Sequence, residues 1–202
     1  MKRFILLGLM MSVVTLTGCA GKGEVVKLRL NDVMQSTMKD AGQSLSVSVP
    51  GFEDRRLPSD HLGTHACLFG GISYFDLLDG NLGQGVSEAF VNYLNESGFK
   101  ASASQSGTGD VRINGRITKF SANATGQFLS TNLKVDAIME FDIANAADGS
   151  TVRMTIGAGG ADDVVFFAPE DMEALVNEVL QEGFLELVEK TTVQGKTLRR
   201  KI

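Results

Sequence analysis

The sequence predicts an α+β domain: an antiparallel sheet of about four to five strands with two helices packed on one face, in the order β-α-β-β-β-α. Three observations support this fold class. Apolar and polar residues alternate over 45–49, 111–117 and 133–143, as in strands that bury one face. Residues 82–97 and 169–188 instead repeat their apolar positions every three to four residues, as amphipathic helices do. Short connections between the later strands favour antiparallel pairing, and the helices then cover the apolar face.

The first strand and the first helix both have clear ends. The alternation of valine with serine over 45–49 ends at Pro50 and Gly51. The helix predicted over 82–97 ends at Gly98, which can adopt the left-handed conformation that caps a helix. We expect Phe99 to fold back onto the apolar stripe of that helix.

The later strands form a predicted meander. Alternation resumes at Asp110, a turn is expected over 123–126, and the longest alternating run covers 132–143. Asp148 and Gly149 form a hairpin turn signal, because both tolerate the positive φ angles of a tight turn. A returning strand follows the turn.

The second helix has a well-defined start. Pro169 suits the first turn of a helix, and Glu170, Asp171 and Glu173 place negative charge at its positive end. Residues 164–167 before it extend the returning strand. The helix then continues for about five turns, with an acidic outer face.

The amino-terminal residues predict a lipoprotein signal. Lys2 and Arg3 precede a short apolar run that closes with Leu16-Thr17-Gly18-Cys19, and the run is too short to span a bilayer comfortably. This pattern resembles the lipobox, which implies cleavage before Cys19 and lipidation of its sulfur and its new amino terminus. An ordinary secretory signal is the alternative. Ala20, rather than an aspartate, follows the cysteine and favours the outer membrane, with the domain facing the periplasm.

The chain is therefore expected to have four parts. Residues 1–18 form the cleaved signal peptide, and 19–43 form the lipidated amino terminus and tether. Residues 44–190 form a single periplasmic domain, in which 52–81 is a long loop with a short strand near its end. Residues 191–202 form a basic tail with no apolar period, which we expect to be disordered.

The net charge argues against one class of partner, and the cysteine content limits disulfide pairing. Cleavage removes Lys2 and Arg3 and no acid, so the net charge falls from -5 to about -7, which disfavours nucleic acid as a partner. Lipidation of Cys19 leaves Cys67 without an intramolecular disulfide partner. We expect Cys67 to be a buried thiol, with an intermolecular bridge or a reactive group as alternatives.

Metal-ligand and catalytic residue types cluster only around Asp60, His61, His65 and Cys67. The histidines are four apart, but Gly63 and the surrounding sequence show no helical period, so the spacing does not match a zinc site. A Cys67–His65 nucleophilic pair lacks any oxyanion-hole motif. We therefore expect no metal, no cofactor and no enzyme activity.

An apolar, glycine-containing segment follows these residues. It either fills the core or presents a partner-binding patch on the surface. Its candidate contact residues are Leu68, Phe69, Ile72, Tyr74 and Phe75.

The chain resembles the YajG-type family of outer-membrane lipoproteins, whose function is uncharacterised. The resemblance covers about 40–190 and is carried by the lipobox, the helix ending in Ser97-Gly98-Phe99, the strands 110–117 and 132–143, and the late acidic helix that contains Asn177. It implies no catalytic residues, and the segment 52–75 does not fit the family pattern. The element order is also similar to small periplasmic accessory domains, including ring-forming lipoproteins.

Three functional hypotheses follow. The first is a non-enzymatic, lipid-anchored outer-membrane lipoprotein that binds an envelope protein through a sheet edge or the 68–75 segment, as an accessory or assembly subunit. The second is a self-assembling ring or other homo-oligomer of a secretion or transport system. The third is an enzyme that depends on cysteine and histidine.

Overall fold

The computed structural model describes residues 23–30, 35–43, 45–57, 59–78, 80–104 and 109–201. The signal peptide and Cys19 lie outside these residues. The elements are β1 (Val25–Leu28), β2 (Ser46–Val49), β3 (Phe52–Asp54), β4 (Gly63–Ala66), β5 (Ile72–Leu77), α1 (Leu82–Glu96), β6 (Lys100–Ala103), β7 (Val111–Gln127), β8 (Ser130–Asn145), β9 (Thr151–Val164), α2 (Pro169–Glu189), β10 (Thr191–Gln194) and β11 (Thr197–Arg200).

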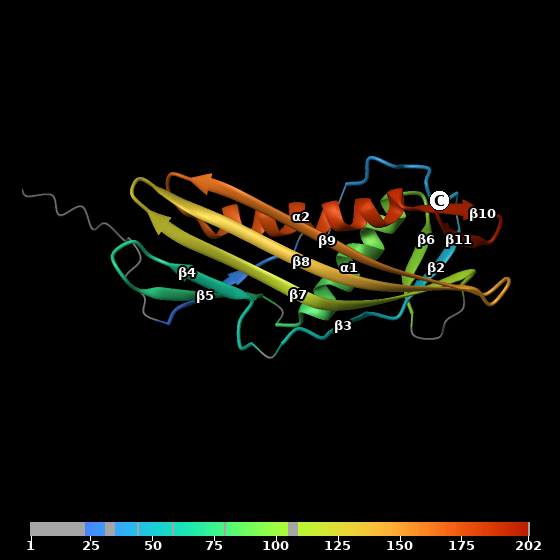
Figure 1. Cartoon of the computed structure of the whole chain (residues 1–202), viewed down its shortest axis with the longest axis horizontal. Helices are drawn as coiled ribbons and strands as arrows, with labels where there is room; N and C mark the ends of the chain where they lie inside the picture. The colour runs from blue at the N-terminus through green and yellow to red at the C-terminus, as the bar shows by residue number, and fades with distance from the viewer. Residues whose placement is uncertain are drawn as a thin grey trace, which may run out of the picture.

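A meander of three long antiparallel strands forms the frame of the fold. Figure 1 shows β7, β8 and β9 running along the long axis of the molecule. In β8 every second side chain is buried, from Leu133 through Phe141 to Ile143, as its alternating sequence predicts. The predicted hairpin turn is confirmed: Gly149 has a φ of 70° and joins β8 to β9.

Shorter strands line the other edge of β7. The strands β2, β3 and β4 pair with β7 one after another, all in parallel. Beyond them, β6 pairs in parallel with β2, β5 pairs antiparallel with β4, and β1 pairs in parallel with β5. The described residues thus form one mixed sheet of nine strands, with β10 and β11 as a separate hairpin.

This nine-stranded mixed sheet shows that the predicted fold class is wrong. The protein has a mostly-sheet fold with a large mixed sheet and, in the described part of the chain, two helices, rather than an α+β fold with four to five antiparallel strands. The additional strands are three to six residues long. Such strands are too short to show a period, and each is stabilised by its pairing with a neighbour rather than by its own pattern.

A β-bulge explains the misplaced turn. The register between β7 and β8 shifts between Ile117 and Lys119. Ile113 and Ile117 are buried before the shift, and Phe120 and Ala122 are buried after it. A bulge adds one residue and reverses which residues face inward. The alternation in the sequence therefore breaks, although β7 continues through the turn predicted over 123–126.

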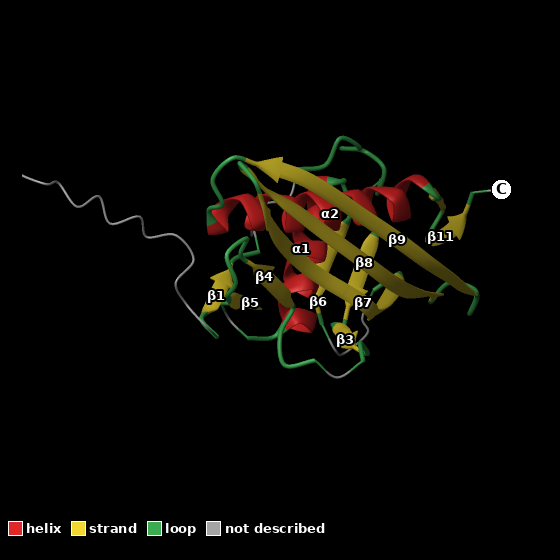
Figure 2. Cartoon of the chain, turned by 60° about the vertical axis from the view of Figure 1, so that its left-hand side comes forward, coloured by secondary structure: helices red, strands yellow, loops and turns green. Residues whose placement is uncertain are grey.

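Both helices pack against the sheet with the predicted stripes. Figure 2 shows α1 and α2 behind the meander. Asn81 caps α1 by accepting a hydrogen bond from the Gln84 backbone N–H (3.0 Å). Gly98, with a φ of 84°, ends α1 and lets Phe99 fold into the core, as predicted. In α2, Pro169 occupies the first turn as predicted.

Two segments predicted to be irregular belong to the fold. Within the predicted tether, Val25–Leu28 forms β1, and the Leu28 side chain is fully buried. Within the predicted disordered tail, β10 and β11 form a hairpin that buries Leu198. Two basic residues of this hairpin form ion pairs with the body of the domain: Lys196 with Asp110 (3.1 Å) and Arg199 with Asp148.

Candidate functional site

The four residues considered as metal ligands lie at two different pockets. Asp60 and His61 line a polar pocket of about 290 Å³. His65 and Cys67 line a larger, apolar pocket of about 590 Å³. Among the described residues, no three histidine, cysteine or acidic side chains are arranged to hold a metal ion.

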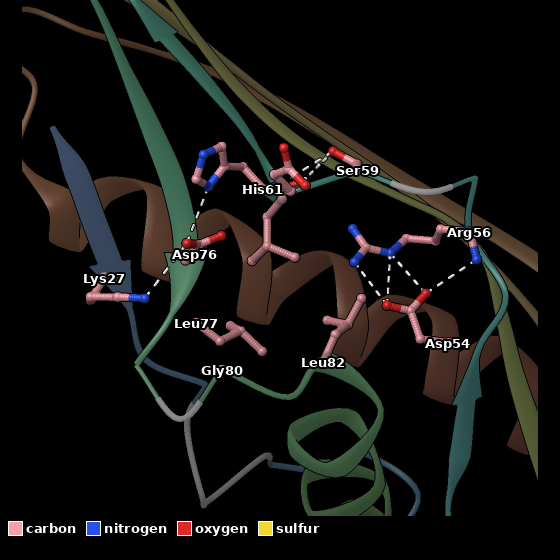
Figure 3. A pocket seen from close by; sticks show the side chains of 11 residues that line it. Lys27, Asp54, Arg56, Ser59, His61, Asp76, Leu77, Gly80 and Leu82 are labelled. Carbon is pink, nitrogen blue, oxygen red and sulfur yellow. Dashed lines mark hydrogen bonds and ion pairs between the residues drawn. The ribbon is translucent and has the colours of Figure 1, made fainter. Parts of the chain in front are cut away.

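The polar pocket is built from strands β1, β3 and β5 and from the segment that precedes β4. Figure 3 shows His61 Nδ1 and Lys27 Nζ both directed at Asp76, at 3.2 and 3.5 Å from Oδ2. The His61 ring also stacks on Tyr74, with 4.2 Å between the ring centroids. Asp76 thus organises this side of the pocket.

The opposite wall of the polar pocket is an arginine–carboxylate pair. Arg56 donates to both carboxylate oxygens of Asp54, at 2.8 to 3.2 Å. These hydrogen bonds hold the pKa of Asp54 below its usual value, with burial acting in the opposite direction. Asp54 is therefore paired with Arg56 on one wall, and Asp76 with Lys27 and His61 on the other. Ser59 Oγ donates to the His61 backbone carbonyl (2.7 Å) rather than to the imidazole. This is not the arrangement of a base and its nucleophile.

The apolar pocket contains the second histidine. The His65 ring is buried, 4.3 Å from the Phe167 ring centroid and 6.3 Å from that of Phe75. Burial lowers the pKa of His65, which favours the neutral imidazole.

Cys67 differs from the buried thiol that the sequence favoured. It is disulfide-bonded in the structure rather than a thiol. The chain has one other cysteine, Cys19, which lies outside the described residues. A sulfur that carries a lipid thioether cannot also belong to a disulfide, so in a chain lipidated on Cys19 the Cys67 sulfur is not joined to Cys19.

The predicted partner-contact residues have different environments. Leu68 and Phe69 are exposed in the turn between β4 and β5, and Ile72 is exposed at the start of β5. Tyr74 lies against His61. Phe75 is fully buried and is removed from the candidate surface, because alternation along β5 turns it into the core.

Further exposed apolar residues join Leu68 and Phe69 at the same end of the molecule. They come from the turn between β7 and β8 and from the connection between β9 and α2, and Figure 1 shows these loops together at its left-hand end. We name this surface the apolar end and define it by six residues. They are Leu68, Phe69, Phe128, Leu129, Val165 and Phe166.

Sequence patterns did not reveal the second half of the apolar end. Phe128 and Leu129 lie just past a strand whose end was misplaced by the bulge. Val165 and Phe166 follow β9 and were expected to extend it. A signal is present in the sequence, because apolar residues rarely occupy a two-residue hairpin turn.

A second exposed feature is the outer edge of β9. Asn145 N donates to Ser150 O (2.9 Å), and the register between β8 and β9 is constant from there. Ladder hydrogen bonds in an antiparallel pair involve every second residue, so the even-numbered residues of β9 bond to β8. The backbone groups of the odd-numbered residues, such as Thr155 and Gly157, point to the open edge. In the described part of the chain, β9 pairs with β8 alone.

Comparisons with known proteins identify the fold but not a family. No family model and no curated protein matches the chain. Among solved structures, it is similar to protein XCC0632 from Xanthomonas campestris, which carries the family description DUF330. The two share 12% identity over 82% of this chain and 93% of that chain, with a TM-score of 0.51. This similarity shows a shared fold.

Weaker similarities include a dodecamer and a lipoprotein. A PelC dodecamer from Paraburkholderia phytofirmans is 10% identical over 73% of this chain and 93% of that chain, with a TM-score of 0.37. Lipoprotein GNA1162 from Neisseria meningitidis is 11% identical over 67% and 95%, with a TM-score of 0.27. At these TM-scores neither carries an argument, and the YajG-type resemblance stays a prediction.

Across the residues that the structure describes, no helix combines the length and the apolar character needed to cross a bilayer.

Proposed function

We propose that this protein is a non-enzymatic, lipid-anchored outer-membrane lipoprotein whose periplasm-facing domain binds an envelope protein by strand addition to β9. The anchor rests on the lipobox that ends at Cys19. The observation that carries the binding function is the open edge of β9, a strand of 14 residues. Unpaired backbone donors and acceptors along such an edge accept an extended segment of another chain.

The composition of β9 supports this proposal. Edge strands are ordinarily protected from association by charge, proline or a bulge. From Met154 to Ala161 the strand contains neither a charged residue nor a proline, and its register with β8 has no bulge. Gly157 lies at the centre of this stretch, where a Cβ atom would meet nothing within 4 Å. An incoming backbone therefore meets little steric resistance there.

Substitution of Gly157 tests strand addition directly. Gly157→Pro removes an outward-facing N–H and no ladder bond to β8, so the domain keeps its fold while the edge is blocked. Gly157→Ala is the matched control, because its methyl group fits without contact. We expect crosslinking in intact envelopes to recover a partner with the wild type and Gly157→Ala, and to lose it with Gly157→Pro.

Other outcomes of the crosslinking experiment would redirect the proposal. Adducts of the chain with itself, lost in the same variant, would identify the partner as a second copy and favour the homo-oligomer. A partner retained by Gly157→Pro would exclude the β9 edge as the binding surface.

The anchor is tested separately by the intact mass of the exported protein. We expect a chain that begins at Cys19 and carries acyl groups, and a Cys19→Ala variant that carries no acyl group. An unlipidated chain in which a disulfide joins Cys19 to Cys67 would overturn the anchor.

A further inference from the structure

The apolar end is a protruding surface rather than a gap in the core. The exposed fractions of Phe69, Phe128, Leu129 and Phe166 are 96%, 81%, 75% and 87%. They come from three connections that are far apart in the sequence: the β4–β5 turn, the β7–β8 turn and the segment after β9. Single exposed apolar residues are normal, whereas several gathered on one surface indicate a binding surface.

The base of the apolar end is well ordered by packing. His65 and Phe167 lie beneath it, with their rings in contact, and Phe167 also packs on Phe75 (5.9 Å). The β4–β5 turn is closed by a hydrogen bond from Cys67 N to Gly71 O (3.1 Å). The residues that line the apolar pocket at this end include no aspartate, glutamate, lysine or arginine. The exposed apolar side chains are therefore supported by a packed base without charged residues.

The turn between β7 and β8 is unfavourable for folding alone. Gln127 pairs with Ser130, so Phe128 and Leu129 form a two-residue hairpin turn, and Leu129 has a φ of 70°. Such turns favour Asn-Gly, because a side chain with a Cβ atom is strained at positive φ. Here a strained leucine and a phenylalanine are both directed into solvent. Because these two residues do not stabilise the fold, their presence favours a contact with something outside the domain.

The start of the described chain lies at the same end. Gly23 N donates to Ile72 O (2.8 Å), directly after the β4–β5 turn that carries Leu68 and Phe69. Cys19 precedes Gly23 by four residues, which span at most about 14 Å when fully extended. A lipid on Cys19 therefore keeps this end of the domain close to the bilayer surface.

From this arrangement we propose that the apolar end inserts into the lipid bilayer beside the anchor and fixes the orientation of the domain on the membrane. This inference rests on the lipidation of Cys19 in the proposed function. Acyl chains on Cys19 hold the protein at the membrane, and the aromatic tips enter the boundary between headgroups and acyl chains. The occupant of the surface is the lipid itself.

The surrounding charges specify the type of lipid contact. Asp162 and Asp163 are exposed at the end of β9 next to Val165. Negative charges beside the surface do not attract anionic headgroups. The contact therefore depends on apolar insertion, and we expect it to be insensitive to salt and to the content of anionic lipid.

The test uses a tryptophan reporter, because the chain contains no tryptophan. Full-length lipidated Phe166→Trp protein is reconstituted into vesicles of phosphatidylethanolamine and phosphatidylglycerol with brominated acyl chains. Thr151→Trp, at the exposed opposite end of β9, is the matched control. We expect bromine to quench roughly half or more of the Phe166→Trp emission, since interfacial insertion reaches acyl-chain depth. The Thr151→Trp emission should not change.

A second variant separates the apolar end from the anchor. Non-lipidated Cys19→Ala protein should still partition onto these vesicles, and replacing Phe69, Phe128 and Phe166 with serine should weaken that partitioning by about tenfold or more, since their apolar area no longer leaves water. All three side chains are exposed, so their removal leaves the core intact.

Each remaining outcome contradicts a specific statement. Equal emission of both reporters with and without bromine overturns bilayer insertion, even where mass spectrometry shows lipid on Cys19. Shielding of Phe166→Trp in vesicle-free solution, with a dimer by light scattering, assigns the surface to a second copy. Absence of lipid on Cys19 overturns the anchor of the proposed function, while vesicle binding of the Cys19→Ala protein reports on insertion by itself.

Discussion

His61 and His65 are four residues apart, yet their rings have different environments. His61 precedes β4 and faces the polar pocket, where it contacts Asp76. His65 lies inside β4, and its ring is turned among the aromatic residues of the core. The sequence indicates which residue types are present, but a short strand without a pattern does not reveal which of them point inward. The two rings therefore face different surroundings, and the burial of His65 could not be predicted from the sequence.

Burial of His65 predicts a pH-dependent stability. Its pKa is lowered in the folded state, so the unfolded chain takes up a proton at a higher pH than the folded chain. Stability is therefore greatest above the unfolded pKa of about 6.5 and falls as the pH drops below it. We expect urea unfolding to give a lower free energy of unfolding at pH 5.5 than at pH 7.5, because the unfolded chain binds a proton that the buried His65 of the folded chain does not.

Two substitutions identify the histidine responsible. His65→Phe should remove most of the difference between the two pH values, because phenylalanine does not titrate. His61→Gln, in the polar pocket, should leave that part of the dependence in place. A dependence that persists in His65→Phe would assign it to other groups.

At the scale of elements, the long segments were predictable and the short ones were not. Helices α1 and α2 and strand β8 carry enough repeats for their periods to be recognised. Strands β3 and β4 have three and four residues, and their backbone hydrogen bonds come from neighbouring strands: β7 for β3, and β5 together with β7 for β4. The paired region of β7 is long enough to accommodate three such partners, and that property belongs to the folded sheet rather than to any local sequence.

The turn between β7 and β8 predicts a conflict between stability and membrane contact. Replacing Phe128-Leu129 with Asn-Gly fits the positive φ at Leu129. We expect the free energy of unfolding to rise by about 1 kcal/mol, since strain of that order is relieved. Vesicle partitioning of the same variant should fall. Phe128→Ala alone is the control, which reduces partitioning without relieving the strain. A double variant that is less stable than the wild type would show that the native turn is not strained.

The carboxy-terminal hairpin is predicted to be part of the folding unit. Leu198 exchanges hydrogen bonds with the Asn145 side chain, donating to Oδ1 (2.7 Å) and accepting from Nδ2 (3.2 Å), and its own side chain is buried. We expect Leu198→Ala to lower the free energy of unfolding by about 2 to 4 kcal/mol, the usual cost of a truncated core leucine. Arg200→Ala, at an exposed position of the same strand, should change it by less than about 0.5 kcal/mol. Equal effects of the two variants in chemical unfolding would mean that the hairpin is not packed on the domain.

At the scale of the whole molecule, topology brings the two proposed surfaces into a fixed relation. The apolar end occupies one end of the long axis, and β9 runs away from it along the edge of the sheet (Figure 1). A domain that stands on its apolar end presents the open edge of β9 to the periplasm, beyond the headgroups. Such a relation could not be predicted from the sequence, since it depends on which turns of the meander lie together.

This relation predicts an upright domain at the membrane. The 14 residues of β9 span about 45 Å at the usual rise per residue. A donor fluorophore at Thr151 should therefore lie tens of ångströms from acceptor-labelled headgroups, farther than a donor at Asp163. Energy transfer measured on lipidated protein in vesicles compares the two positions.

Replacing Phe69, Phe128 and Phe166 with serine keeps the anchor but removes insertion, so the two donors should then report similar average distances, as expected of a domain that tumbles on its tether. Equal distances in the unsubstituted protein would show that the lipid alone holds the domain, without a preferred orientation.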